Sequence, residues 1–420
     1  MTLIQIARKS LLNRKATTFL TVLSIAFSVS LLLGIERVRS GARKSFESTV
    51  SGVDLIVGAR SGPVNLLLYS VFRIGNATNN ISHQSFEEFR KHEKVKWAIP
   101  ISLGDSHKGF RVIGTNQNYF LRYKYAGDQK LTFKKGKPFK ELFDVVVGAD
   151  VSEKLQYKVS DKITLSHGSG DVSFQDHADK PFTIVGILNR TGTPVDKSVH
   201  ISLEAIKALH VDWQDGAPPR PGKEISPERT LKMDLKPSDV TAFFVKLSSR
   251  ISVFNVQREI NGYEAEALMA ILPGVTLRDL WETIGIVEKA LLIVSIFVFV
   301  VSIVGMVISL LSTLSERRRE MAILRSIGAK KRFVFSVLII ETCILTVSGI
   351  LIGISTLYLG LVLFRPILES KMGLTLGLLS PTFNDFVYVG SIFIGSLLAS
   401  VIPAWRAYKN SLADGLIVKS

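Results

Sequence analysis

The chain alternates between long uncharged apolar runs and stretches of mixed polarity. Four runs contain no charged side chain: residues 16–35, 290–315, 342–364 and 386–405. A helix needs about 20 apolar residues to cross a hydrocarbon core of about 30 Å, and each run reaches that length. A buried helix of a soluble protein seldom stays uncharged for so long. We therefore predict four transmembrane helices at 16–35, 290–315, 333–364 and 386–405, the third interrupted only by Glu341.

The segment 36–289 lies between the first two predicted spans. It holds 36 basic and 30 acidic residues, which is an ordinary balance for a folded domain. Short runs rich in β-branched and aromatic residues predict strands, at 145–148, 162–166, 181–188, 198–203 and 241–247. Helices are predicted at 85–92 and 203–209, the second capped by Ser202. The sequence thus predicts a membrane protein with four transmembrane helices and a large mixed α+β domain between the first and second.

The ends of this segment show helical patterning. Residues 36–50 and 255–289 are predicted to extend the first two spans outward as stalks, the second with a break near Pro273. Four prolines between residues 213 and 234 predict a surface loop. The apolar run 66–72 is interpreted as buried structure, with an exposed docking surface as the alternative.

Basic residues in short loops set the orientation of membrane helices. Residues 1–15, 316–332 and 406–420 carry net charges of +4, +5 and +2, which is +11 of the whole +16. We therefore place both termini and the 316–332 loop in the cytoplasm. The domain 36–289 and the loop 365–385 then lie outside. The first span follows four basic residues, as a signal peptide does, but its apolar part is too long and no cleavage site follows. It is predicted to remain as an anchor.

Composition and motifs exclude several classes. One cysteine, Cys343, excludes an internal disulfide and a cysteine-cluster metal site. The excess positive charge is a topology signal that also attracts anionic membrane lipid, and no reading element indicates nucleic-acid binding. The sequence holds no H-E-x-x-H, no G-x-S-x-G and no phosphate-binding G-x-x-x-x-G-K-[ST]. We expect a protein that is not an enzyme, with no cofactor in this chain.

The predicted cytoplasmic loop has an amphipathic pattern. Met321, Leu324 and Ile327 recur at helical spacing among charged residues that include Arg317, Glu320 and Arg325. Gly328 follows as a C-cap residue. The residues alone leave two interpretations open: a helix lying on anionic lipid or a helix docked on a protein partner.

Three blocks of sequence resemble a known family. E-R-R-R-E-M-A-I-L-R-S-I-G-A at 316–329, followed by Glu341, Gly349 and Gly353, is similar to the FtsX-like permease domain of ABC transporters of the MacB/LolC/FtsX type. Residues 7–26 resemble the first span of that family and residues 402–407 its C-terminal signature. V-V-G-A-D at 146–150, continuing through 161–165, resembles the outer domain of MacB-type members.

The resemblance implies a function and partners. Such permeases form homodimers or related heterodimers in the bacterial inner membrane, with the large domain in the periplasm, and bind separate ATPase subunits that carry ATP and Mg²⁺. The loop 316–332 would be the coupling helix. ATP-driven movement would pass to the outer domain, a process called mechanotransmission, for transport or extraction of a substrate. The absence of an ATPase motif departs from the macrolide-exporter pattern and requires a partner chain.

Two features of the predicted spans suggest specific roles. Gly349 and Gly353 form a small-x-x-x-small pair, and Gly395 with Ala399 repeats that spacing in the last span, which favours close helix packing. Glu341 lies about two turns inside the third span. Acidic residues within membranes are usually functional or paired, and we expect loop arginines as partners, with a solvated interfacial carboxylate or a proton relay as alternatives.

All seven histidines fall between residues 83 and 210. His167 and His177 flank acidic residues, and imidazole with carboxylate suits zinc-like ions. Ordinary surface histidines are the competing interpretation, because the spacing matches no closed zinc motif.

Two alternatives to the permease function stay open on the sequence. One is a signalling scaffold whose outer domain activates a hydrolase or sensor. The other is divalent metal handling, with zinc as the example, together with an outer binding protein. An extracytoplasmic binding protein or a lipoprotein is a candidate outer partner in these interpretations.

Overall fold

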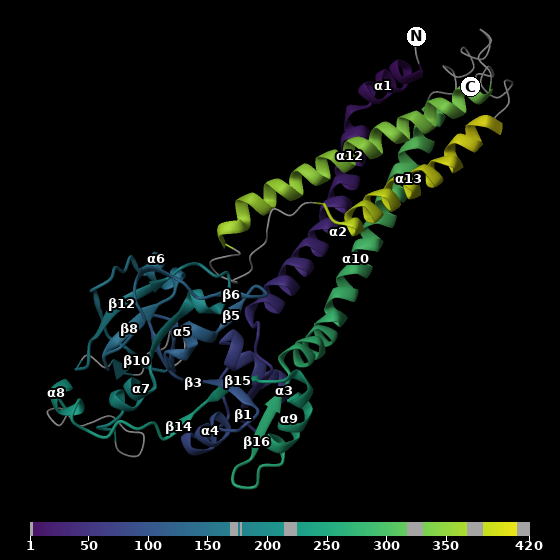
Figure 1. Cartoon of the computed structure of the whole chain (residues 1–420). Helices are drawn as coiled ribbons and strands as arrows, with labels where there is room; N and C mark the ends of the chain where they lie inside the picture. Colours follow the sequence, from purple (N-terminus) through teal and green to yellow (C-terminus); the bar gives the residue numbers. More distant parts are fainter. Residues whose placement is uncertain are drawn as a thin grey trace. The chain divides into compact units, whose positions relative to one another are not determined.

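The computed structural model describes residues 3–168, 175–176, 179–213, 225–316, 331–367 and 381–409. The chain divides into two compact units (Figure 1). Among the described residues, the helical unit comprises 3–41, 284–316, 331–367 and 381–409, and the sheet unit comprises the described part of 42–283. Each unit is described by itself.

Five helices of the described residues belong to the helical unit wholly or in part. They are α1 (Leu3–Asn13), α2 (Lys15–Thr49), α10 (Pro273–Glu316), α12 (Lys331–Ile367) and α13 (Phe383–Lys409). In the described part of the chain four helices are long and apolar enough to cross a membrane, namely the segments Lys15–Gly41, Pro273–Ser312, Arg332–Phe364 and Phe383–Arg406. The predicted number and order of spans is therefore confirmed. α1, which the sequence analysis did not predict, packs against α12.

One apolar cluster holds the four long helices together. Each helix contributes to it, with Val29 from α2, Met306 from α10, Leu338 from α12 and Ile392 from α13, all at most 2% exposed. Other large apolar side chains of the same helices point outward, such as Phe297 and Leu351. This distribution fits helices surrounded by lipid, because lipid tails are as apolar as the side chains themselves.

The sheet unit contains one large mixed sheet, in the strand order β16-β1-β15-β3-β4-β13-β8-β12-β7. The bounds of these strands are β1 (Leu55–Ala59), β3 (Val95–His107), β4 (Phe110–Thr115), β7 (Phe133–Gly136), β8 (Asp144–Val147), β12 (Phe182–Leu188), β13 (Ser198–Ser202), β15 (Ala242–Leu247) and β16 (Leu268–Ile271). Three short strands attach at its side, β9 (Lys162–Ile163), β10 (Ser166–His167) and β11 (Gln175–Asp176). Two small pairs complete the described strands: β2 (Ile81–Ser82) with β14 (Asp239–Val240), and β5 (Lys124–Tyr125) with β6 (Gln129–Lys130).

The long strand β3 joins the two halves of this sheet. Its first half pairs antiparallel with β15, where Ile99 lies opposite Phe244. Its second half pairs with β4, and the register shifts between Leu103 and Ser106. At the register shift β3 also pairs with β10, where Asp105 lies opposite His167 and Ser106 lies opposite Ser166. Asp105 and Ser106 therefore lie beside β10 rather than beside β15.

Short helices cover the sheet. They are α3 (Pro63–Leu67), α4 (His83–Arg90), α5 (Asn118–Arg122), α6 (Ala149–Leu155), α7 (Leu203–Leu209), α8 (Pro227–Thr230) and α9 (Val253–Asn261), with a π-helical turn η1 (Leu68–Phe72) and 3-10 turns η2 (Pro194–Lys197) and η3 (Arg250–Ser252). The side chains of α3 and η1 are largely buried in a cluster with Ile99 and Phe244. The buried interpretation of the run 66–72 is therefore confirmed.

Several predicted elements are confirmed. Strands β8, β12, β13 and β15 lie where the β-branched runs predicted them. The predicted strand 162–166 is two short strands, β9 and β10. The predicted helices correspond to α4 and α7, and the Ser202 hydroxyl caps α7 by accepting a hydrogen bond from the Ala205 amide at 3.0 Å.

Two predictions are wrong in part. The stretch 255–289 is not a helix with one break: α9 ends at Asn261, β16 pairs with β1, and Pro273 begins α10. Proline suits the first turn of a helix because its missing N–H has no partner there in any case. The proline-rich region 213–234 contains the short helix α8, which also starts at a proline, while residues 214–224 lie outside the described part.

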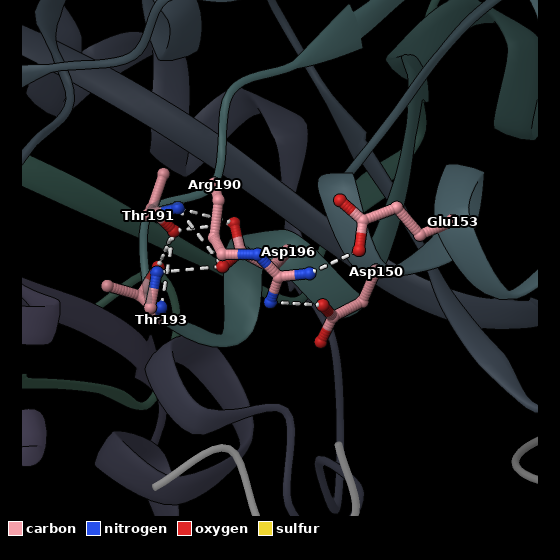
Figure 2. Close-up of polar contacts among 7 residues, drawn as sticks. Asp150, Glu153, Arg190, Thr191, Thr193 and Asp196 are labelled. Carbon is pink, nitrogen blue, oxygen red and sulfur yellow. Dashed lines mark hydrogen bonds and ion pairs between the residues drawn. The ribbon is translucent and has the colours of Figure 1, made fainter. Parts of the chain in front are cut away.

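A buried carboxylate organises the connection between β12 and β13. Asp196 is 2% exposed and accepts hydrogen bonds from the Thr191 and Gly192 amides at 2.7–3.0 Å and from the Thr191 hydroxyl at 2.8 Å. Figure 2 shows Arg190 beside it, bound to Asp150 at 2.7 Å and Glu153 at 2.6 Å. Burial raises the pKa of Asp196, while the hydrogen bonds it accepts lower it. The cluster fixes a loop rather than forming a reactive site.

We expect Asp196→Asn to destabilise the sheet unit by about 1–3 kcal/mol, because an amide nitrogen would face buried N–H donors. Hydrogen exchange of the full-length protein in detergent should show faster exchange at residues 189–199. Glu153→Gln is the matched control, since its ion pair with Arg190 is about half exposed and such pairs contribute about 0–1 kcal/mol. Equal exchange in both variants would contradict this role of Asp196.

Candidate functional site

The predicted coupling loop lies outside the described residues. Its candidate residues therefore stay predictions: Arg317, Glu320, Met321, Leu324, Arg325, Ile327 and Gly328. The structure describes what flanks the loop, since α10 ends at Glu316 and α12 begins at Lys331. The candidate sites of the described residues lie in the packing of the helical unit and in the polar clusters of the sheet unit.

The first of these is a close approach of α12 to α2 at two glycines. A Cβ atom added at Gly349 would lie 2.6 Å from Cγ2 of Ile25, and one at Gly353 would lie 2.6 Å from the Ala26 carbonyl oxygen. Real Cβ atoms do not come that close, so no larger residue fits without moving a helix. Gly395 of α13 makes a looser approach, where a Cβ atom would lie 3.2 Å from Phe299 of α10.

Hydroxyl groups connect the same helices. The hydroxyl of Ser302 on α10 lies 2.8 Å from that of Ser24 and 2.7 Å from that of Ser28, both on α2. Ser30 of α2 donates to the Gly353 carbonyl oxygen of α12 at 2.7 Å. Hydrogen bonds between membrane helices contribute roughly 0.6–2 kcal/mol each. α2 is therefore bound to both α10 and α12 by small and hydroxylated residues.

Charged residues also connect α2 with α10 and with α13. Arg37 of α2 forms a buried ion pair with Asp385 of α13, whose carboxylate also accepts from the Thr382 amide at 2.7 Å. Arg39 lies 2.9 Å from Glu36 and 3.8 Å from Glu288 of α10. The contacts to Asp385 and Glu288 bring the end of the first apolar run (16–35) close to the starts of the second (290–315) and fourth (386–405) within the helical unit.

Glu341 is buried within the helical unit. Its exposed fraction is 1%, and its neighbour Thr342 is fully buried. This burial does not fit the alternative of a solvated interfacial carboxylate. Of the loop arginines expected as its partners, Arg332 lies in the described part and is exposed, and the others, Arg317, Arg318, Arg319 and Arg325, lie outside it.

The sheet unit brings an aspartate and two histidines together. Asp105 lies near the end of β3, His167 on β10, and His210 directly after α7. The Nδ1 atom of His167 lies 3.2 Å from Oδ1 of Asp105 and 3.2 Å from Nε2 of His210, and the latter lies 3.6 Å from Oδ1. The hydrogen bond to Asp105 raises the pKa of His167.

This cluster differs from the predicted pair. The sequence pattern pointed to His167 with His177, and His177 lies outside the described residues. Asp105 and His210 were missed because they are 62 and 43 residues away from His167 in sequence. Only the pairing of β10 with β3, which places His167 opposite Asp105, reveals the cluster.

A basic recess of about 390 Å³ lies elsewhere on the sheet unit. Trp97 and Leu121 form part of its wall, and six cationic side chains line it: Lys96, Arg122, Lys124, Lys130, Lys246 and Arg250. Lys124 pairs with Asp128, and Lys246 lies 2.9 Å from Asp54. The excess of positive charge favours anionic groups at this surface.

Comparisons with known proteins agree with this architecture. A family model described as the MacB-like periplasmic core domain matches residues 18–263, which is more than half of the chain. A second, described as the FtsX-like permease C-terminal domain, matches residues 292–412. The chain belongs to the MacB/FtsX family of ABC transporter permeases. This resemblance, expected from residues 316–329 and 146–150, is thereby confirmed.

Solved structures and curated proteins were also compared. The periplasmic region of MacB from Actinobacillus actinomycetemcomitans matches at 9% identity and a TM-score of 0.34, over 55% of this chain and 94% of that one. The extracellular domain of the noncanonic ABC-type transporter YknZ from Gram-positive bacteria matches at 11% identity and a TM-score of 0.30, over 52% and 98%. The comparison with curated proteins gave no matching relative.

Membership of the family has coarse consequences that hold for this permease. It is a membrane protein whose mixed α+β sheet unit is its periplasmic domain, inserted between the first and second spans. Its relatives are transporter permease subunits that work with ATPase subunits.

We expect Gly349→Leu to weaken the helical unit, because the added side chain would overlap Ile25 of α2 and overpacking typically costs about 1–3 kcal/mol. The measurement is unfolding of the purified permease in mixed micelles of increasing denaturing detergent. Gly360→Leu on the same helix is the matched control, since a Cβ atom there meets no atom within 4 Å among the described residues. Equal stability of the two variants would argue against close packing of α12 on α2 at Gly349.

Proposed function

We propose that this permease couples ATP hydrolysis on a separate ATPase subunit to movement of its periplasmic domain. The observation that carries the proposal is the continuity of two helices. α2 and α10 are uninterrupted, and each contains residues of both the helical unit and the sheet unit. An α-helix is a rigid element whose backbone hydrogen bonds resist extension, so displacement of its membrane part would reach its other end.

The sheet-unit ends of both helices are firmly attached. At the end of α2 the Tyr123 hydroxyl donates to the carbonyl oxygen of Thr49, which is 2% exposed. The following Ser51 amide donates to the Lys124 carbonyl oxygen at 3.0 Å. α10 starts two residues after β16, and its Leu277 packs against the cluster that contains Ile271. Movement of either helix would therefore act on the sheet itself.

Within the helical unit α2 and α10 are tied to each other. The Ser302 contacts with Ser24 and Ser28 and the Arg39 contact with Glu288 connect them directly. α12 packs closely on α2 at Gly349 and Gly353, and α12 is also the helix that directly follows the predicted coupling loop in the chain. A push at that loop would pass through α12 to α2 and so to the periplasmic domain.

The partners of the proposed mechanism follow from the family. The loop 316–332 would dock on an ABC ATPase that binds ATP and Mg²⁺, because the sequence contains no P-loop of its own. A second permease copy, identical or related, would complete the assembly. The basic segments 1–15, 316–332 and 406–420 support cytoplasmic termini in the inner membrane, with membrane lipid as the surrounding partner.

Leu324→Ala should loosen the ATPase by roughly ten- to a hundredfold, because a buried leucine anchor contributes about 1.5–3 kcal/mol and each 1.4 kcal/mol is about a factor of ten. Gly328→Val should impair coupling as well if Gly328 adopts a left-handed C-cap. The measurement is retention of the ATPase during purification, with its identity established by its P-loop sequence, and ATP turnover in lipid nanodiscs.

Ser326→Ala is the control, since it changes the same segment away from the apolar stripe. If the loop instead lies on anionic lipid, the arginines would dominate at about 1 kcal/mol each, and Leu324→Ala would leave ATPase retention unchanged. Normal retention and turnover in both Leu324→Ala and Glu320→Ala would refute the docking role of the loop.

A further inference from the structure

We propose that Asp105, His167 and His210 form a divalent metal site of the zinc class in the periplasmic domain. The proposal concerns the sheet unit alone and does not depend on coupling to an ATPase. Each residue offers one ligand atom, and these atoms lie within 4.8 Å of one another. The residues come from three separate elements, β3, β10 and the end of α7, so the fold rather than local sequence brings them together.

The spacing of the ligand atoms fits one small ion. Zinc binds histidine nitrogen at about 2.0–2.1 Å and carboxylate oxygen at about 2.0–2.2 Å, usually as a tetrahedron. In a tetrahedron of that size two ligand atoms are about 3.3 Å apart. The three separations here are 3.2, 3.2 and 3.6 Å. An ion about 2 Å from each atom would therefore lie just outside the plane of the three, with no large movement of the side chains.

The second atom of the carboxylate points to a missing positive partner. Asp105 is fully buried, and its Oδ2 atom has no hydrogen-bond partner among the described residues. Buried polar atoms nearly always have a partner, whereas the contacts of this carboxylate with the two histidines all go to Oδ1. A bound cation supplies that partner. Because Asp105 is buried, its carboxylate cannot turn toward solvent as that of a surface residue would.

The hydrogen bond made by His210 selects the form that binds metal. Its Nδ1 atom lies 3.0 Å from the Ile206 carbonyl oxygen. Because a carbonyl only accepts, the neutral imidazole in this position carries its proton on Nδ1, and its Nε2 lone pair faces His167 and Asp105. A backbone carbonyl on the far ring nitrogen is the usual arrangement of a metal-binding histidine, because it fixes the ring and the tautomer.

Neighbouring side chains hold the histidines in place. Trp213 packs against both imidazoles, with ring centroids 4.7 Å from His167 and 5.1 Å from His210. The segment carrying His210 and Trp213 is anchored by Asp212, which accepts from the buried Lys180 ammonium at 2.9 Å. A site held this way is arranged before any ion arrives.

The site is open on one side. The side chains of His167 and His210 are 41% and 25% exposed, whereas that of Asp105 is 1% exposed. Among the described residues three protein ligands converge, which leaves the fourth position of a tetrahedron for water or another donor. Open coordination of this kind suits an ion that exchanges with the surroundings. Two nitrogens and one carboxylate favour zinc and neighbouring transition metals over calcium or magnesium.

The test uses the full-length permease in detergent, stripped with a chelator and titrated with zinc against a chromophoric competitor. The wild type should bind one ion tightly per chain. His210→Ala and Asp105→Asn should each weaken that binding at least a hundredfold, since even residues behind the ligands change metal affinity by about 10–100-fold. Cobalt should give the intense visible absorption of a tetrahedral site in the wild type and lose it in both variants.

His92→Ala is the matched control, because His92 also lies 3.2 Å from a carboxylate, that of Glu259, but no second histidine of the described residues joins that pair. It should bind zinc as the wild type does. Thermal unfolding in chelator shows whether each variant folds. If Asp105→Asn does not fold, zinc binding by His210→Ala alone tests the proposal. The proposal is overturned if the wild type binds no stoichiometric zinc, or if a folded His210→Ala binds it with wild-type affinity.

Discussion

The helical unit depends on the close approach of α12 to α2 at Gly349 and Gly353. Lipid tails are as apolar as leucine, so burying apolar side chains gives membrane helices little reason to associate. Association must come from close packing and from hydrogen bonds between helices. Gly353 allows backbone contact with Ala26, and Gly349 leaves room for the side chain of Ile25. The Ser30 hydroxyl adds a hydrogen bond to α12, and the Ser302 hydroxyl of α10 adds one to α2. A larger residue at either glycine would separate α2 from α12, and the proposed path of force would be lost with it.

The periplasmic domain depends in a similar way on one element, the strand β3. Its first half belongs with β15 and its second half with β4, and its end carries Asp105 toward β10. The same strand therefore supports the sheet that receives α2 and α10 and the cluster proposed to bind zinc. An ion at Asp105, His167 and His210 would link β3, β10 and the end of α7.

The sequence predicts the membrane part better than the sheet. Transmembrane helices can be recognised in the sequence because the hydrocarbon core excludes charged residues over about 20 positions. The spacing of Gly349 and Gly353 can be recognised too, because both lie in one helix. β3 was missed because Pro100 and Gly104 interrupt its alternation, although both lie within the strand. Of the proposed metal cluster the sequence indicated His167 alone, because Asp105 and His210 approach it only through strand pairing and the end of α7. Long-range contacts of this kind leave no local pattern in one sequence.

The most direct test of the account is to interrupt α10 where a Cβ atom meets no atom within 4 Å among the described residues, at Gly285. Gly285→Pro removes one helical hydrogen bond and kinks the helix, whereas Gly285→Ala keeps it straight. Hydrogen exchange of the permease with its ATPase is measured with and without ATP and vanadate. The account predicts an ATP-dependent change at residues 268–283 in the wild type and Gly285→Ala that disappears in Gly285→Pro, with ATPase binding retained. An unchanged response in Gly285→Pro would contradict transmission through α10.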